Sequence, residues 1–150
     1  MSLQNLFGPA DISASGLAAE RMRMEVAANN IANARSTRAG GNGPYRRQQV
    51  VFEAELAGGV RSIAGAGASS ALGGVRVAEV TTDESPFPRV FDPGHPDADE
   101  DGMVTMPNVT LPYEMVDLMT ASRAYEANLK ALSAFRQMAE QSLSLLQQVR

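Results

Sequence analysis

The sequence has 150 residues, of which 44% are hydrophobic and 20% are charged, and its formal net charge is −4. This length fits one domain or a small domain with extensions, and the hydrophobic share excludes a chain that is disordered throughout. The negative charge, without dense clusters of Lys and Arg, disfavours nucleic acid as a partner. Because cysteine is absent, disulfides, zinc–thiolate sites and cysteine nucleophiles are excluded.

An amphipathic helix is predicted in the N-terminal part of the chain. Asp11 follows Pro9 and is a suitable N-cap, and the pattern stops before Gly40. The predicted helix has about 23 residues and is roughly 35 Å long, although Gly16 weakens its first turns. Its apolar stripe consists of residues spaced by seven with alanines beside them: Leu17, Met24, Ile31, Ala14, Ala27, Ala28 and Ala34.

Two or three short strands are predicted in the middle of the chain. β-Branched residues cluster over Arg46–Glu53 and Val75–Thr82. Between these segments, residues 57–74 are rich in Gly and Ala, which is typical of a flexible loop. Repeated prolines then interrupt regular structure, so residues 85–108 are predicted to be an extended connection with a few strand-like residues.

A longer helix is predicted from Thr110 to the end of the sequence, because Pro112 is the last residue of either Gly or Pro type. Thr110 is the candidate cap, and Pro112 is tolerated in the first turn. About 39 residues give a length of roughly 58 Å. Its apolar stripe has residues mostly three or four apart: Met115, Leu118, Tyr125, Leu129, Leu132, Phe135, Ala139, Leu143, Leu146 and Val149.

The unequal helix lengths indicate partners outside the chain. Pairing helices that differ by about 16 residues leaves roughly 24 Å of apolar stripe uncovered. Either other copies of the chain or the middle segment folded back must cover it, and we favour other copies. Charge is also uneven, since Arg35–Arg61 is rich in arginine and Arg76–Gly102 is acidic. These patches either join copies head to tail or are solvated faces.

The sequence offers weak candidates for chemistry. His95 lies between prolines, without a second residue at the spacing of a triad or a metal pair, so a loop histidine is the preferred interpretation. The segment Asp97–Gly102 (DADEDG) matches the first half of an EF-hand loop, but its twelfth position is Asn108 where a bidentate Glu is needed. We predict an acidic turn there, with weak cation binding as the alternative. No catalytic group, metal site or cofactor is predicted.

Three asparagines, Asn29, Asn30 and Asn33, crowd one helical segment. Asparagine is unfavourable inside helices, so the cluster indicates either side-chain hydrogen bonds that fix register or partner, or an exposed and fraying helix end. The residue pattern as a whole predicts a self-associating structural subunit. The alternative is a cytoplasmic coiled-coil binding or regulatory module.

Two segments resemble the terminal signatures of flagellar rod and hook proteins: ISASGLAAERMRMEVAANNIANA (Ile12–Ala34) and EMVDLMTASRAYEANLKAL (Glu114–Leu132). The short length and the intervening segments GPYRRQQVVFEA and DPGHPDADEDGMVTMPNVTLPYEM look most like the proximal-rod members of that family. The resemblance covers most of the chain except residues 57–74. It departs at Arg35–Thr37, where the family usually continues with Asn-Thr.

The resemblance implies a division of the chain that agrees with the residue pattern. Residues 1–36 and 110–150 are expected to be helices that pack together as one axial domain, in an antiparallel or parallel-assembling coiled coil. Residues 37–109 are expected to form a middle β and irregular segment that faces outward. The fold class is thus mainly α with a small β part.

The resemblance also implies a structural, non-enzymatic subunit of the basal-body rod that transmits torque. Such proteins leave the cell through the flagellar type III export apparatus without a cleaved signal peptide, and residues 1–10 lack the basic and apolar regions of such a signal. The implied partners are copies of the chain, other rod proteins, and the MS-ring with its adaptor. The residues predicted to carry assembly lie on the two helices: Leu17, Met24, Asn29, Asn30, Ile31, Asn33, Leu118, Tyr125, Leu132, Phe135 and Leu146.

Overall fold

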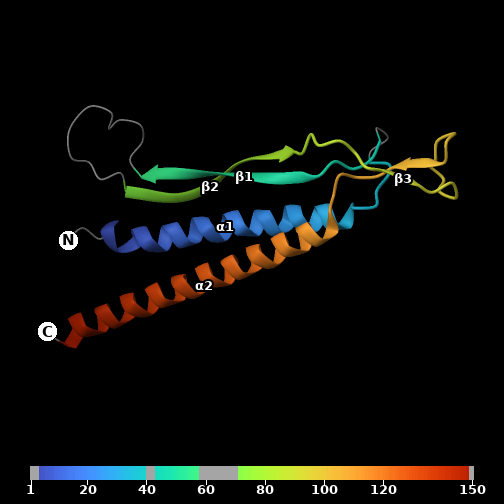
Figure 1. The fold of residues 1–150 in the computed structure, drawn as a ribbon. Coiled ribbons are helices and arrows are strands. Elements are labelled where there is room, and N and C mark those ends of the chain that lie inside the picture. The colour runs from blue at the N-terminus through green and yellow to red at the C-terminus, as the bar shows by residue number, and fades with distance from the viewer. Residues whose placement is uncertain (1–3, 40–42, 58–70, 149–150) are drawn as a thin grey trace, which may run out of the picture. The chain divides into compact units, whose positions relative to one another are not determined.

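The computed structural model describes residues 4–39, 43–57 and 71–148, with side chains for residues 10–39, 43–55 and 73–144. Helix α1 covers Gln4–Ala32 and helix α2 covers Leu111–Gln148 (Figure 1). Between them lie the strands β1 (Gln48–Ala57), β2 (Ala71–Thr82), β3 (Arg89–Phe91) and β4 (Met103–Thr105). The predicted fold class, mainly α with a small β part, is confirmed.

The chain divides into two compact units. Unit 1 takes its residues from Met1–Arg21, Phe52–Ala78 and Ser122–Arg150. Unit 2 consists of Met22–Val51 and Glu79–Ala121. Each unit therefore contains part of α1, part of α2 and part of the β1–β2 sheet, and unit 2 also contains β3 and β4.

Helix α1 begins earlier than predicted. The prediction that Asp11 caps it is wrong, because α1 begins at Gln4 and continues through Pro9. Proline lacks the N–H that bonds the fourth preceding carbonyl, so its place in the second turn costs one backbone bond without ending the helix. Helix α1 has 29 residues and α2 has 38. Their lengths thus differ by about 14 Å, and the predicted mismatch of roughly 24 Å is wrong.

Helix α2 begins where the sequence predicts. The carbonyl of Thr110 accepts hydrogen bonds from the N–H groups of Tyr113 and Glu114, at 3.0 and 3.2 Å. Thr110 therefore stands at the N-cap position, and Pro112 lies in the first turn, where its missing N–H has no helical partner to lose.

The predicted strands are confirmed, and they form two small sheets. β1 and β2 pair with each other, and their arrows run in opposite directions in Figure 1. Both strands extend into the Gly/Ala-rich stretch predicted as a loop, of which residues 58–70 lie outside the described residues. β3 and β4 form a short antiparallel pair with Val90 opposite Val104. The connection predicted over residues 85–108 thus contains a hairpin, and Val104 is buried.

Within unit 2, α1 and α2 run antiparallel. Asn30 of α1 bonds Glu114 of α2, and Arg23 pairs with Asp117. From the first contact to the second, the residue number decreases on α1 and increases on α2. The two helices therefore run in opposite directions. The most buried alanines, Ala27 and Ala121, belong to these helix segments, and such small side chains allow the two backbones to come close.

Within unit 1, glycine and serine bring the elements together. A Cβ atom built on Gly16 of α1 would lie 2.9 Å from the side-chain nitrogen of Asn128 on α2, so the space beside Gly16 is taken by that amide. Gly74 of β2 has a φ of +119°, and a Cβ there would overlap the hydroxyl of Ser15 on α1. That hydroxyl accepts a hydrogen bond from the N–H of Val75 at 3.1 Å. The contact of β2 with α1 therefore depends on the absence of a side chain at residue 74.

Candidate assembly site

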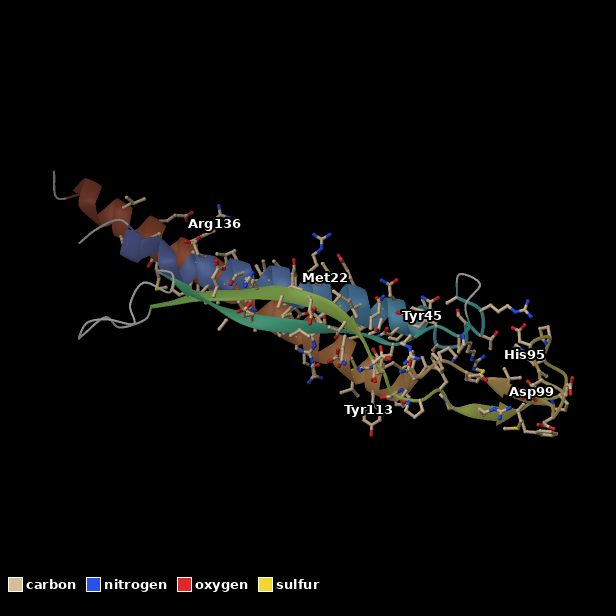
Figure 2. The ribbon with its side chains drawn as sticks, turned by 90° about the horizontal axis from the view of Figure 1, so that it is seen from above. Met22, Tyr45, His95, Asp99, Tyr113 and Arg136 are labelled. Atoms are coloured by element: carbon tan, nitrogen blue, oxygen red, sulfur yellow. The ribbon has the colours of Figure 1, made fainter. Side chains whose placement is uncertain are left out.

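The predicted apolar stripe of α2 separates into a half-buried and an exposed part. The half-buried part consists of Leu118, Tyr125, Leu132, Phe135 and Ala139. The exposed part includes Leu129 and Leu143 in unit 1, which are 47% and 60% exposed. These two leucines and Arg136 are spaced by seven residues, so they lie along one line of the helix. We call Leu129, Arg136 and Leu143 the α2 ridge. Arg136 projects away from the ribbon in Figure 2.

A second exposed apolar group lies in unit 2, on the first turns of α2. Its members are Tyr113, Met115, Val116 and Met119. Tyr113 is 75% exposed and points away from the ribbon (Figure 2). Large apolar side chains gathered on a surface usually mark an interaction site. We call this group the α2 patch.

The predicted stripe of α1 has members of all three degrees of burial. Its large side chains, Leu17, Met24 and Ile31, are half-buried. Of its alanines, Ala27 and Ala34 are buried, and Ala14 and Ala28 are exposed. The buried positions on or just after α1 carry mostly small side chains, namely Ser13, Ala19, Val26, Ala27, Asn30 and Ala34. The periodicity thus identified the helix, but the face nearest the rest of the chain is the one with small residues.

The three asparagines have three different environments. Asn29 is exposed, and its carbonyl accepts a hydrogen bond from the side chain of Asn33 at 2.9 Å. Asn33 in turn accepts a bond from the Ser36 hydroxyl just after the helix. Asn30 is buried, with 1% of its surface exposed. Side-chain hydrogen bonds, one of the two predicted alternatives, are therefore what Asn30 and Asn33 make.

The Asn30 amide makes four hydrogen bonds within unit 2. Its nitrogen donates to the carbonyl of Gln48 and to a carboxylate oxygen of Glu114, both at 2.8 Å. Its oxygen accepts from the hydroxyl of Tyr45 and the backbone N–H of Gln48, both at 2.9 Å. Since an amide offers two donors and two good acceptor positions, Asn30 is fully satisfied. It ties α1 to α2 and to the start of β1.

Glu114 carries the charge of this network. It is 1% exposed, and its other oxygen accepts a hydrogen bond from Arg47 Nε at 2.6 Å. Arg47 also faces Asp83 at 3.6 Å. Partial burial lowers the pKa of Arg47, but the hydrogen bond and charge of Glu114, with Asp83, raise it overall. Burial, and next the charge of Glu114, raise the pKa of Tyr45. We call Asn30, Tyr45, Arg47 and Glu114 the buried polar cluster.

The basic and acidic segments of the sequence meet inside unit 2. Arg38 pairs with Asp97, and Arg47 with Asp83. Arg46 lies 3.7 Å from Glu84 and stacks over the ring of Phe87, 4.4 Å from its centre. The uneven charge therefore serves contacts within the chain at these positions, which weakens the idea that these patches join copies.

The acidic turn is held by local hydrogen bonds. Asp99 accepts from the backbone N–H of Met103 at 2.8 Å, and it pairs with Arg89. Its pKa is lowered by the Met103 N–H and, to a lesser extent, by Arg89. Nδ1 of His95 accepts a hydrogen bond from the N–H of Asp97 at 3.1 Å. Figure 2 shows His95 and Asp99 near the β3–β4 hairpin of unit 2. Among the described residues, no three His, Cys, Asp or Glu side chains are placed to hold a metal ion.

Two of the predicted residues have no described environment. Leu146 lies within α2, but its side chain is outside the described ones, and Val149 is outside the described residues altogether. No contact or functional role was predicted for Arg47, Glu114, Ser15 or Gly74. In the sequence, Glu114 looks like an ordinary solvated acid in the first turn of a helix. Its partner Asn30 is 84 residues away. No local pattern signals such a pairing.

The chain is similar to flagellar rod proteins over almost its whole length. Residues 11–38 match the family described as flagella basal body rod protein, and residues 100–145 match the flagellar basal body rod FlgEFG protein C-terminal family. The flagellar basal-body rod protein FlgC of Salmonella typhimurium is 43% identical over 97% of this chain and 98% of the relative.

Relatives from two other bacteria give a consistent result. FlgC of Borreliella burgdorferi is 40% identical over 95% of this chain and 98% of the relative. FlgC of Bacillus subtilis is 40% identical over 93% of this chain and 97% of the relative.

In the described part of the chain, neither long helix has the combination of length and apolar character needed to cross a membrane.

Proposed function

The chain belongs to the FlgC family of flagellar basal-body rod proteins, and from that premise we propose that it polymerises through α1 and α2 as a subunit of the proximal rod. Membership makes it a structural component of the flagellar basal body. The finer statements, that the terminal helices carry assembly and that the polymer transmits torque, are our proposal. We also propose that the chain has no catalytic role.

The observation that carries this proposal is the exposure of large apolar side chains on a helix pair that is already fixed internally. The buried polar cluster satisfies the polar groups between α1 and α2 in unit 2. The α2 patch and the α2 ridge nevertheless expose methionine, leucine, valine and tyrosine. Burying such side chains against a neighbour is favourable by about 25 cal/mol per Å² of apolar surface, which gives the subunit a reason to assemble.

The residues proposed to carry assembly remain those predicted on the two helices. The half-buried Leu17, Met24 and Ile31, together with Leu118, Tyr125, Leu132 and Phe135, each keep part of their surface available. We add Met119 and Leu129, whose side chains are more exposed. Asn30 acts differently in this proposal, because its buried hydrogen bonds shape the helix pair that is presented to neighbours.

The partners proposed for the chain follow from its family. Assembly with other rod proteins is what membership of a rod family implies. Contacts with the MS-ring and its adaptor, and passage through the flagellar type III export apparatus to a periplasmic rod, are further parts of our proposal. We assign no nucleic acid, cofactor or small-molecule substrate.

The test uses a flagellated strain whose own copy is deleted and replaced by variants. We expect Leu129→Asp and Met119→Asp to abolish swimming and to remove the chain from purified basal bodies, because a carboxylate cannot be buried in an apolar contact. Ser133→Asp, which places the same group at an exposed polar position of α2, is the control and should swim normally. Circular dichroism of the purified variants should show unchanged helix content.

Two outcomes would contradict the proposal. One is normal swimming by both apolar-to-Asp strains, with the chain present in the basal bodies. The other is a wild-type chain that stays in the cytoplasm and never joins purified basal bodies. That second result would favour the alternative of a cytoplasmic binding or regulatory module.

A further inference from the structure

Methionine supplies all the sulfur atoms of this chain, because the sequence contains no cysteine. The thioether of methionine is oxidised to a sulfoxide by reagents that can reach the sulfur. Among the described side chains, three methionines are more than half exposed, namely Met115, Met119 and Met138. Met103 and Met106, in and just after β4, are half-buried. The structure therefore separates the methionines by their access to an oxidant.

Met115 and Met119 differ from Met138 in their surroundings. They are 51% and 56% exposed and lie four residues apart on α2, so their side chains are neighbours on one face of the helix. Both belong to the α2 patch of unit 2, whose other members are also apolar and exposed. Met138 is 52% exposed but belongs neither to this patch nor to the α2 ridge, and Ser142, one turn further on, is polar and bonds its carbonyl. Equal access to an oxidant thus has different consequences at the pair and at Met138.

We propose that Met115 and Met119 form a paired oxidation site, at which a peroxide converts both thioethers to sulfoxides and thereby blocks entry of the chain into the rod. This inference rests on the proposed function, in which the α2 patch is buried against a neighbouring rod protein. It adds a chemical reaction that controls that contact.

Each oxidation transfers an oxygen atom from the peroxide to a thioether. A sulfur lone pair forms the new S–O bond, the O–O bond of hydrogen peroxide breaks, and the second oxygen leaves as water with both hydrogens. The sulfur loses two electrons and the peroxide gains them, so no further reactant is needed. The product is polar where the patch had an apolar group, and a methionine sulfoxide reductase restores the thioether.

The sulfoxides change what the α2 patch can bind and leave the fold intact. In the free chain their oxygens face water and are hydrated. When a neighbour buries the patch, each oxygen needs a hydrogen-bond donor, which an apolar contact does not offer. The buried polar cluster, which joins α1 to α2 in unit 2, contains no sulfur and is not altered. An oxidised subunit should therefore stay folded and fail to assemble.

The first experiment measures the oxidation itself. The purified full chain is treated with hydrogen peroxide, and peptide mass spectrometry follows the sulfoxide at each methionine with time. We expect Met115 and Met119 to be oxidised several-fold faster than Met103 and Met106, while circular dichroism shows unchanged helix content. Oxidation of all four at the same rate overturns the assignment of the site.

The second experiment measures the consequence for assembly, in a flagellated strain whose own copy is deleted. The double variant Met115→Gln with Met119→Gln places a polar oxygen where each sulfoxide would stand, whereas Met115→Leu with Met119→Leu stays apolar and cannot be oxidised. Leucine, glutamine and methionine have similar helix propensities, so neither change should unfold α2. Basal bodies should contain at least about tenfold less of the glutamine variant than of the leucine variant. Met138→Gln is the matched control and should assemble like the parent chain.

The outcomes separate this inference from the proposed function. If the glutamine double variant assembles like the parent while Met119→Asp does not, the oxidation site is overturned and the role in the rod stands. Equal losses in the glutamine and leucine double variants, or an equal loss in Met138→Gln, also overturn it, because polarity at the pair is then not what blocks assembly. A wild-type chain missing from basal bodies overturns the proposed function, and this inference with it.

Discussion

In unit 2 the helices are joined by buried polar side chains, whereas in unit 1 they meet through a glycine and a side-chain amide. The cluster of unit 2 places Glu114 and Asn30 almost wholly out of water and pairs both. In unit 1, Gly16 faces Asn128, and Ser15 bonds the backbone next to Gly74. One unit is specified by hydrogen-bond partners and the other by the space that small residues leave.

The difference determines how each unit responds to a shift of one element against the other. Sliding α1 along α2 in unit 2 would leave Glu114 buried without Asn30, and an unsatisfied buried group costs about 1–3 kcal/mol, or more if charged. Packing contacts between small residues tolerate a shift of one helix along the other more easily. They depend on the volume that the side chains fill and less on the direction of a bond. We therefore expect unit 2 to fix the register of the helix pair.

The largest effect is expected from Glu114→Ala, which removes the charge at the centre of the buried polar cluster. Breaking a buried ion pair from one side costs about 3–5 kcal/mol, and we expect the lower end because Arg47 keeps Asp83 and is partly exposed. The free energy of unfolding, measured by urea denaturation followed by circular dichroism, should fall by about 3 kcal/mol. Glu126→Ala, at an exposed site on α2, is the control and should change it by about 0.5 kcal/mol or less. A matching small loss in both variants would show that the cluster does not hold unit 2 together.

Gly74→Ala tests the corresponding contact of unit 1. The left-handed φ of +119° strains any residue with a Cβ, and that Cβ would also displace the Ser15 hydroxyl from the N–H of Val75. We expect a loss of about 2–3 kcal/mol, the sum of backbone strain and one lost hydrogen bond.

The matched control for residue 74 is Gly43→Ala. Gly43 has a φ of +101°, but a Cβ there would meet nothing within 4 Å. This variant should therefore lose only the backbone strain, about 1 kcal/mol. Equal losses at residues 43 and 74, in the same urea titration, would show that the close approach of β2 to α1 contributes nothing.

A smaller effect is expected from pH, through two carboxylates of unit 2. Hydrogen bonds from the side chain and N–H of Ser85, and next the Arg47 charge, lower the pKa of Asp83. The N–H of Met103 and Arg89 do the same for Asp99. A carboxyl whose pKa is lower in the folded chain stabilises it fully above its unfolded pKa, near 3.8, and loses this contribution as pH falls through the folded value.

The thermal midpoint should therefore be insensitive to these groups at neutral pH and should decline below about pH 4. Asp83→Asn and Ser85→Ala should each make that decline shallower, because the first removes the titrating group and the second removes its hydroxyl donor. Melting curves between about pH 3 and pH 7 measure this. An acid decline that is just as steep in both variants as in the parent chain would contradict the role of Asp83.

The sequence predicted the elements well because their signals are local. Heptad spacing marks α1 and α2, β-branched residues mark β1 and β2, and Thr110 with Pro112 marks the start of α2. The start of α1 was missed because Pro9 was taken to precede the helix, whereas the helix runs through it. The local rule says that proline is unfavourable inside a helix. It does not say whether the other residues of the helix outweigh that cost.

The candidate site was predicted less completely because exposure is a tertiary property. Leu129 and Leu132 belong to the same predicted stripe, yet Leu132 is half-buried and Leu129 is exposed. Spacing within α2 does not say which of the two the rest of the chain covers. The pairing of Asn30 with Glu114 likewise depends on two segments 84 residues apart, which no spacing within either helix encodes.

The smallest effect is expected from Gly16→Ala, and its smallness is informative. A Cβ at residue 16 would lie 2.9 Å from the Asn128 side-chain nitrogen, which is the movable end of a flexible side chain. Replacing glycine by alanine inside a helix stabilises it by about 1 kcal/mol, and a small shift of the Asn128 amide offsets part of that gain. The free energy of unfolding should therefore change by about 0.5 kcal/mol or less. In the double variant Gly16→Ala with Asn128→Ala, the amide is gone, and the helix gain should appear in full. If Gly16→Ala instead costs more than about 2 kcal/mol, the approach of the two helices in unit 1 is as strictly specified as the cluster of unit 2, because the amide then has nowhere to move.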